Sequence, residues 1–270
     1  MKKSILFIFT ACCLFTTSCS DFLDEEHKTK YSSEYVFGTP EGLKLAVNAL
    51  YALQRYYAND TENATIFALE RGTDLAVTNG GTGNFYGIYD PNYLKPSASQ
   101  VGFMWRTMYQ IIGKANEIIA AAEDLEDTPS LRATVSEAKC FRAQSYFLLY
   151  RTFDRIWLNI QPTTAENVND PRDFHAASEK EVFDLIYEDL EYAITNLDWV
   201  SDEAGRFTQA AARHMKAKAA LWLKDWDTTL EQVEEIEKSG HFDLIALNEV
   251  FNAGDLNHKE ALMVQQCSKN

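Results

Sequence analysis

Aromatic and amide-bearing side chains are concentrated between residues 74 and 93. Aromatic rings pack against the CH faces of sugars, and neighbouring amides or carboxylates hydrogen-bond the sugar hydroxyls. This stretch therefore predicts a binding site for a polyhydroxylated ligand. Its candidate residues are Asp74, Asn84, Phe85, Tyr86, Tyr89 and Tyr93. The alternative is that these rings only pack the stretch against neighbouring helices.

These candidates belong to a longer segment, residues 71–100, that interrupts a helical pattern. Its glycines and prolines predict a loop between two helices, and loops of this length in compact domains are usually functional or disordered. The rings that lie between Phe85 and Tyr93 argue against disorder. We therefore expect an ordered, functional loop.

No arrangement of residues in the sequence matches a catalytic or metal-binding motif. The histidines form no i, i+4 pair, and no cysteine cluster accompanies them. The Gly-rich run at 80–83 lacks the Gly-Lys-Ser/Thr of a phosphate-binding loop, and there is no G-x-S-x-G. We expect no catalysis and no cofactor. A lipid-anchored glycoside hydrolase is kept as an alternative, because 40 acidic residues give carboxylate pairs by chance.

The N-terminus has the pattern of a secretion signal that ends at a cysteine. Lys2 and Lys3 precede an apolar stretch, residues 5–15, which is too short to span a bilayer. Small residues then lead to Cys19, as in the lipobox of bacterial lipoproteins, which this segment resembles although Thr16 stands where Leu is usual. The resemblance implies that Cys19 is lipidated and becomes the new N-terminus.

We accordingly expect a lipoprotein signal peptide over 1–18 and an acidic tether over 19–38. Two or more acyl chains suffice for stable anchoring, so contact with the membrane would be through the lipid only. An acidic start after the lipidated cysteine resembles the surface-export signal of Bacteroidetes lipoproteins. The alternatives are a plain solvated linker, and an ordinary secreted protein cut near Ser18 without lipid.

Charge and composition limit the partners of this chain. The 270 residues carry a formal net charge of −15, which argues against nucleic acid and against docking on anionic headgroups. A hydrophobic fraction of 46% indicates a globular chain. The composition is compatible with neutral ligands.

Apolar residues recur at helical spacing through most of the mature chain. In one predicted helix, Ser178 and Glu181 form a capping box ahead of an apolar stripe. The predicted helices span 41–57, 105–125, 130–153, 178–197, 208–223 and 227–238. The sequence thus predicts a mainly all-α protein.

The last two predicted helices resemble a tetratricopeptide repeat. Small residues on the first helix allow a close approach of the second, and Ser239-Gly240 fits a left-handed helix end. Trp222 and Trp226 are interpreted as packing residues of this pair. Residues 131–197 predict a second, less regular pair.

Two residues of the 130–153 helix are expected to be buried. Arg142 lies in an Ala-containing run and requires a carboxylate partner, for which Glu137 and Asp189 are the candidates. Cys140 is interpreted as a small core residue.

Several weak motifs follow one another in an order typical of a single family. They are the lipobox with its acidic tail, Trp105-x3-Tyr109-x2-Ile112-x2-Ala115-Asn116, Glu137 to Ala143, Ser178-x2-Glu181-Val182, Gly205-Arg206-Phe207-Thr208, and Ser239-Gly240-His241-Phe242. Their joint order resembles the SusD/RagB family of Bacteroidetes outer-membrane lipoproteins.

The resemblance implies an outer-membrane lipoprotein that faces the cell exterior and has no catalytic activity. It implies binding of glycans, or in some cases peptides, as oligosaccharide or peptide nutrients. It also implies a partner, a SusC-type TonB-dependent transporter, against which tetratricopeptide-like helical pairs dock. The expected fold is therefore a set of such pairs with the aromatic, Gly-rich loop inserted between helices.

Two departures from the family pattern affect this expectation. Residues 154–158 read Asp-Arg-Ile-Trp-Leu where the family usually has Gly-Asp-Val-Pro-Leu. The sequence ends at residue 270, where a typical member continues for a long C-terminal portion. We expect an N-terminal fragment with a SusD-like helical domain over 39–270. A truncated helical-repeat scaffold without ligand binding remains the alternative.

Overall fold

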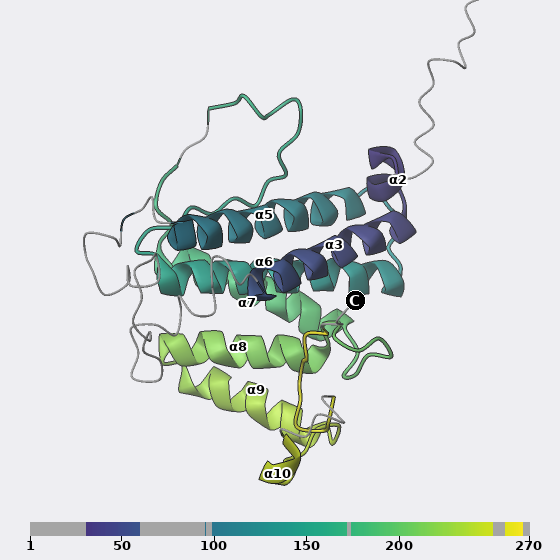
Figure 1. Ribbon diagram of the computed structural model, residues 1–270, viewed down its shortest axis with the longest axis vertical. Coiled ribbons are helices and arrows are strands. Elements are labelled where there is room, and N and C mark those ends of the chain that lie inside the picture. Colours follow the sequence, from purple (N-terminus) through teal and green to yellow (C-terminus); the bar gives the residue numbers. More distant parts are fainter. Residues whose placement is uncertain (1–30, 60–94, 96–98, 172–173, 251–256, 267–270) are drawn as a thin grey trace, which may run out of the picture.

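The computed structural model describes residues 31–59, 95, 99–171, 174–250 and 257–266 (Figure 1). Every regular element in these ranges is a helix, which confirms the predicted all-α fold. The long helices are α3 (Pro40–Asn59), α5 (Ser99–Ala122), α6 (Pro129–Thr152), α7 (Glu179–Asn196), α8 (Gln209–Leu223) and α9 (Trp226–Lys238). The short helices are α2 (Ser33–Gly38) and α10 (Leu247–Val250).

Four of the long helices, α6 to α9, begin and end within one residue of the predicted positions. Helix α5 differs, because it begins at Ser99 rather than at residue 105. Gly102 lowers the helix propensity of this first turn, but Phe103 is buried and stacks on Tyr57 with ring centroids 6.0 Å apart. Packing of the aromatic ring therefore outweighs the local propensity.

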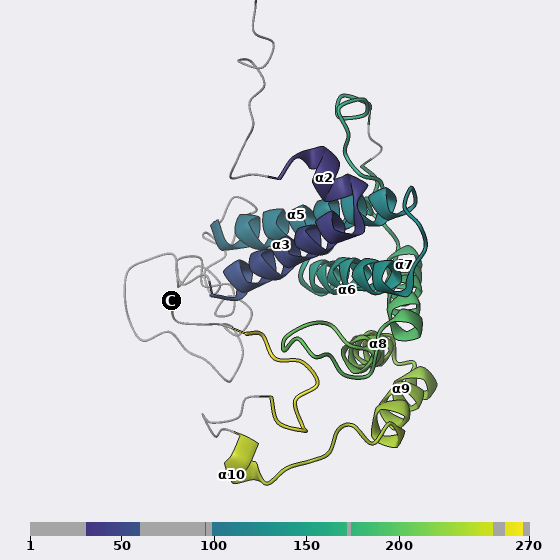
Figure 2. The ribbon, with the colours of Figure 1, turned by 90° about the vertical axis from the view of Figure 1, so that its right-hand side faces the viewer.

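Successive helices pack on one another to form a stack (Figures 1 and 2). Helix α3 contacts α5, α5 contacts α6, α6 contacts α7, and the order continues through α8 to α9. The pairs α6–α7 and α8–α9 are the two pairs that the sequence predicts. Helix α6 also contacts α3 and α8, so it lies at the centre of the stack.

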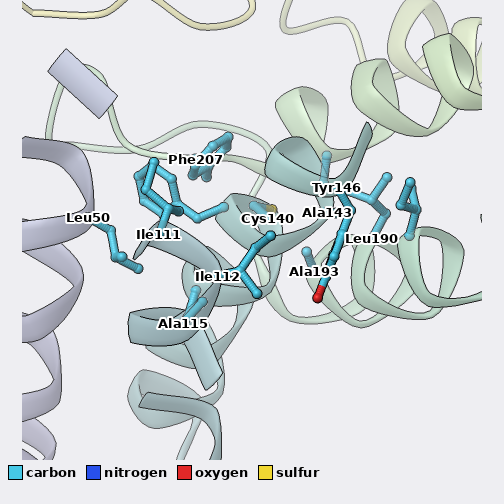
Figure 3. Packing of buried hydrophobic residues seen from close by; sticks show 14 of the residues in the cluster. Leu50, Ile111, Ile112, Ala115, Cys140, Ala143, Tyr146, Leu190, Ala193 and Phe207 are labelled. Atoms are coloured by element: carbon cyan, nitrogen blue, oxygen red, sulfur yellow. The ribbon is translucent and has the colours of Figure 1, made fainter. Parts of the chain in front are cut away.

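The hydrophobic core surrounds α6 (Figure 3). Ile111 and Ile112 of α5 are buried between Leu50 of α3 and the side chains of α6. Cys140 is fully buried, as predicted, and burial raises the pKa of its thiol, which keeps it protonated and unreactive. Tyr146 is also fully buried. Because α6 is enclosed on most sides, its polar residues need partners inside the protein.

Local signals define where the helices begin and end. The Ser178 hydroxyl accepts a hydrogen bond from the Glu181 amide, and the Glu181 carboxylate accepts one from the Ser178 amide, which confirms the capping box. Lys224 adopts a left-handed conformation (φ 62°) at the end of α8 and permits the short turn into α9. Gly240, with φ 70°, follows the end of α9 as the sequence predicts.

A buried ionic cluster joins α6 to its neighbour α7. Asp189 of α7 has no exposed surface and accepts hydrogen bonds from Arg142 Nε (2.7 Å), Arg142 Nη2 (2.7 Å) and Lys139 Nζ (2.8 Å). Of the two partners that the sequence predicts for Arg142, Asp189 is the one that pairs with it in the structure. The bidentate geometry is the strong form of an arginine–carboxylate pair.

The same cluster continues into α5 and into the connection that follows α6. Arg142 Nη1 donates to Asn116 Oδ1 of α5 at 2.8 Å, and Asn116 Nδ2 donates to the Asn159 carbonyl at 2.7 Å. The Asn159 amide in turn donates to the Tyr146 hydroxyl at 2.7 Å. One set of buried polar groups thereby links α5, α6, α7 and the segment before α7.

Glu137, the other candidate, belongs to a second buried cluster. Its carboxylate accepts hydrogen bonds from the Tyr51 hydroxyl and from Arg206 Nη2, the latter at 3.0 Å. The Tyr51 hydroxyl accepts a bond from the Phe207 amide at 2.7 Å. Desolvation raises the pKa of Glu137, against the effects of Tyr51 and Arg206. This cluster links α3, α6 and the segment that precedes α8.

The chain returns along the stack after α10 (Figure 2). Residues 257–266 pass close to Gly205, which has φ 87°. A Cβ atom at Gly205 would lie 2.9 Å from Gln266 Cγ and 3.1 Å from the Val264 carbonyl oxygen. Glycine at this position therefore permits both the backbone conformation and the approach of the returning segment.

We expect Asp189→Asn to lower the free energy of unfolding by about 3–5 kcal/mol, because it leaves two buried cations without a full counter-charge. The matched control is Asp184→Asn, on the same helix, whose exposed pair with Lys180 contributes at most about 0.5 kcal/mol. Denaturant unfolding followed by circular dichroism measures both. Equal effects of the two substitutions would contradict the structural role of the cluster.

We expect Gly205→Ala to destabilise the protein by more than Gly240→Ala. Both glycines have a positive φ, which costs an alanine about 1–2 kcal/mol, but only at Gly205 would the new methyl group collide with residues 264–266. Limited proteolysis measures release of residues 257–266, and thermal unfolding measures stability. Faster cleavage in Gly205→Ala alone is the expected result; equal cleavage in both variants would show that the close approach is unimportant.

Candidate functional site

The site residues predicted from the sequence lie outside the described part of the chain. This applies to Cys19 and to all six candidates of the aromatic segment, from Asp74 to Tyr93. In sequence, that segment follows the end of α3 and precedes α5. Its role in ligand binding remains a prediction, as does lipidation of Cys19.

The described residues form a cleft of about 540 Å³ inside the helical stack. Its size is typical of a site for a small ligand. Side chains of α3, α5, α6, α7 and α8 line it, together with the returning segment. The lining includes Gln54, Tyr57, Met108, Ile111, Gln144, Phe147, Leu148, Arg151, Ile186, Leu190, His214, Met215, Lys218, Glu260, Leu262 and Met263.

Apolar residues form the inner wall of the cleft. Met108 and Ile111 of α5, together with Leu190 of α7, belong to the buried core as well as to the cleft lining. Met263 of the returning segment packs against the same core. The wall is therefore held by the helix packing, and the returning segment contributes one side of the cleft.

Polar groups gather where α3 and α6 end. Gln54 Nε2 donates to Gln144 Oε1 at 2.9 Å. The guanidinium carbon of Arg151 lies 4.4 Å from the centre of the Phe147 ring, a cation–π arrangement. Desolvation lowers the pKa of Arg151, yet an arginine remains charged at neutral pH.

Tyr57 is the unusual member of this group. Its hydroxyl is buried and has no hydrogen-bond partner in the described structure. Desolvation raises the pKa of Tyr57, which the nearby charge of Arg151 partly offsets, so the phenol keeps its proton. A buried donor without an acceptor costs about 1–3 kcal/mol, which an acceptor on a ligand would recover.

Helix α8 contributes two basic side chains to the opposite wall, His214 and Lys218. Desolvation, with the charge of Lys218 second, lowers the pKa of His214, so its imidazole is neutral at pH 7. Glu260 is the one carboxylate of the described lining. In a chain whose net charge is −15, the charged groups of this cleft are mostly cationic.

The apolar wall and the polar groups of the described lining can bind a ligand. A glycosidase requires two carboxylates facing each other, and the described lining supplies a single one, Glu260. Within the described ranges, no group of three or more His, Cys, Asp or Glu residues could hold a metal ion. Nor is any helix in those ranges both long and apolar enough to cross a bilayer.

Sequence patterns did not reveal Tyr57 or Arg151 as possible site residues. Both lie in the last turns of their helices, where a tyrosine or an arginine is commonplace. Only the meeting of α3 and α6 places them together. The signal available in the sequence was the pair Tyr56-Tyr57 at the end of the first predicted helix. Helical periodicity alone does not distinguish a tyrosine that binds a ligand from one that packs in the core.

Comparison with known proteins identifies the family. A family model named SusD-like, described as "Starch-binding associating with outer membrane", matches residues 21–221. A SusD-like protein of Bacteroides ovatus is 25% identical over 291 aligned positions, which cover 98% of this chain and 50% of that protein. The chain spans about half the length of the curated relatives it matches.

Solved structures share the fold. A laminarin-binding SusD-like protein is 24% identical with a TM-score of 0.66, over 76% of this chain and 46% of that one. A structure with a xylogluco-oligosaccharide is 21% identical with a TM-score of 0.69, over 83% of this chain and 46% of that one. At these identities the likeness establishes the fold, and the family match extends over more than half of the chain. The chain belongs to the SusD-like family, as its motifs predict.

Proposed function

We propose that this chain is a lipid-anchored outer-membrane protein that binds glycan, or peptide, nutrients and passes them to a SusC-type TonB-dependent transporter without catalysis. The observation that carries the proposal is the family match over residues 21–221, whose description joins starch binding to the outer membrane. The names of two structural neighbours add laminarin and a xylogluco-oligosaccharide as ligands of those proteins.

The N-terminal organisation supports the anchored location. The family match begins at residue 21, two residues after Cys19, as expected if residues 1–18 are removed and the lipid is attached to the new N-terminus. The acidic stretch that starts at residue 19 would then be the tether of the helical domain. In the structure that domain begins with α2 (Ser33–Gly38), which packs on α3 and α5, and not at residue 39 as the sequence predicts. A tether of this kind supports an exterior orientation, in which the glycan site is open to the medium.

The aromatic segment remains the proposed glycan site. Its rings supply flat apolar faces, and Asp74 and Asn84 supply groups that bind hydroxyls. The cleft between the helices is a weaker candidate for neutral sugars, because its wall is formed mainly by aliphatic and methionine side chains. Phe147 and Tyr57 are the aromatic residues of the described cleft lining.

A second candidate function is a helical-repeat scaffold that binds protein alone. The observation in its favour is an apolar strip on α8 and α9, where Trp222, Trp226 and Leu230 are 48%, 57% and 59% exposed. The sequence predicts packing roles for both tryptophans, and the structure leaves about half of the surface of each residue exposed. Exposed apolar strips of this kind are typical of protein-binding surfaces.

We expect the full chain, reconstituted in phospholipid nanodiscs, to bind laminarin or xyloglucan oligosaccharides in isothermal titration. Changing both Tyr86 and Tyr89 to Ala removes two stacking faces and should weaken binding at least tenfold, at about 1 kcal/mol or more for each ring. The matched control is Tyr31→Ala, an exposed tyrosine beside α2.

The wild type and these two variants distinguish the candidate functions. Loss of binding in the double variant and retention in Tyr31→Ala supports the glycan site in the 71–100 segment. Equal loss in both would indicate an indirect effect. A folded protein that binds no oligosaccharide, no peptide and no glycan polymer would favour the scaffold, and turnover of the oligosaccharide would favour the hydrolase.

We expect Cys19→Ala to abolish lipidation, because the thiol is the acceptor of the lipid. Expression in a Bacteroidetes host with labelled palmitate, followed by membrane fractionation, measures incorporation and anchoring. Labelled, membrane-bound wild type and unlabelled Cys19→Ala is the expected result, with Cys140→Ala as the cysteine control. An unlabelled wild-type protein released into the medium would contradict the anchor.

A further inference from the structure

Arg151 of the cleft is an exposed residue, and its surroundings differ from those of four largely buried cations of the stack. Arg142, Lys139, Arg206 and Lys216 are all paired with carboxylates. Arg151 has no carboxylate within salt-bridge distance in the described structure and instead lies against the Phe147 ring. It is thus a cation at the edge of an apolar cleft with its hydrogen-bonding groups available.

An unsatisfied donor lies in the same part of the cleft. The buried Tyr57 hydroxyl has no acceptor in the described ranges, and Tyr57 lines the same cleft as Arg151. The two side chains come from the ends of different helices, α3 and α6, that meet there. A planar guanidinium next to a phenolic hydroxyl is suited to a carboxylate, which accepts two hydrogen bonds from arginine and a further one from a hydroxyl.

The remainder of the cleft is suited to an apolar group. Met108, Ile111 and Met263 present aliphatic and thioether surface, and methionine adapts to ligands of different shape. Glu260, the acidic residue of the described lining, lies on the returning segment, and its carboxylate accepts a hydrogen bond from the Ile245 amide at 3.2 Å.

We propose that the cleft binds a small organic carboxylate with an apolar body, whose carboxylate is held by Arg151 and Tyr57. The apolar body lies along Met108 and Ile111 of α5 and is covered by Met263 of the returning segment. Lys218 and the neutral His214 on the opposite wall add positive potential and a hydrogen-bonding group near the opening. A neutral sugar would leave the charge of Arg151 unpaired, so this site is separate from the proposed glycan site.

The test compares 3-phenylpropionate with 3-phenylpropanamide, which has the same shape and no charge. Both are titrated into the full chain in nanodiscs, with empty nanodiscs as the blank. We expect the acid to bind at least tenfold more tightly than the amide, because only the acid pairs with Arg151. Equal affinities, or no binding of the acid, would overturn the proposal, and neither result depends on a variant or on glycan binding.

Variants then locate the carboxylate. Arg151→Gln should reduce the affinity for the acid to that for the amide, and Tyr57→Phe should reduce it several-fold while leaving the fold intact. The control is Arg132→Gln, at the other end of α6, where the arginine pairs with Asp127 at the surface. Unchanged affinity for the acid in both Arg151→Gln and Tyr57→Phe would overturn the proposed position. A loss in those two variants and none in Arg132→Gln would support it.

Discussion

The structure depends on one buried carboxylate. Asp189 receives three hydrogen bonds from two cations of α6, and Arg142 extends the same cluster to Asn116 of α5. Apolar packing alone allows neighbouring helices to slide and rotate, since it has little directionality. Buried ionic hydrogen bonds have strict geometry, and breaking them inside the core is costly. The cluster therefore fixes the register of three consecutive helices, around which the core residues then pack.

Similar polar contacts recur along the stack and determine the shape of the cleft. Glu137 joins α6 to Tyr51 of α3, Lys216 joins α8 to α7, and Arg213 Nη1 donates to Gln232 of α9 at 2.8 Å. Each contact fixes the placement of one helix on its neighbour. The cleft lies where α3, α5, α6, α7 and α8 come together, so its width follows from these contacts. A scaffold of this kind presents loops and clefts without itself specifying a ligand.

Much of this fold could be predicted from sequence, because helical periodicity and capping are local properties. The capping box at Ser178 and the left-handed Gly240 illustrate this. The partner of Arg142 was ambiguous, since the choice between Glu137 and Asp189 depends on how α6 faces α7.

The cleft was not predictable, because its lining comes from segments far apart in sequence. The exposure of Trp222 and Trp226 depends likewise on which helix faces remain uncovered. Family membership, by contrast, followed from the order of short motifs.

The central claim is that the Asp189 cluster holds α5, α6 and α7 together as one cooperative unit. Native-state hydrogen exchange, read by mass spectrometry on the wild type and on Asp189→Asn, tests it most directly. The account predicts that amides of all three helices lose protection together in the variant, while those of α9 are affected less. Loss of protection confined to α7, with α5 and α6 unchanged, would contradict it.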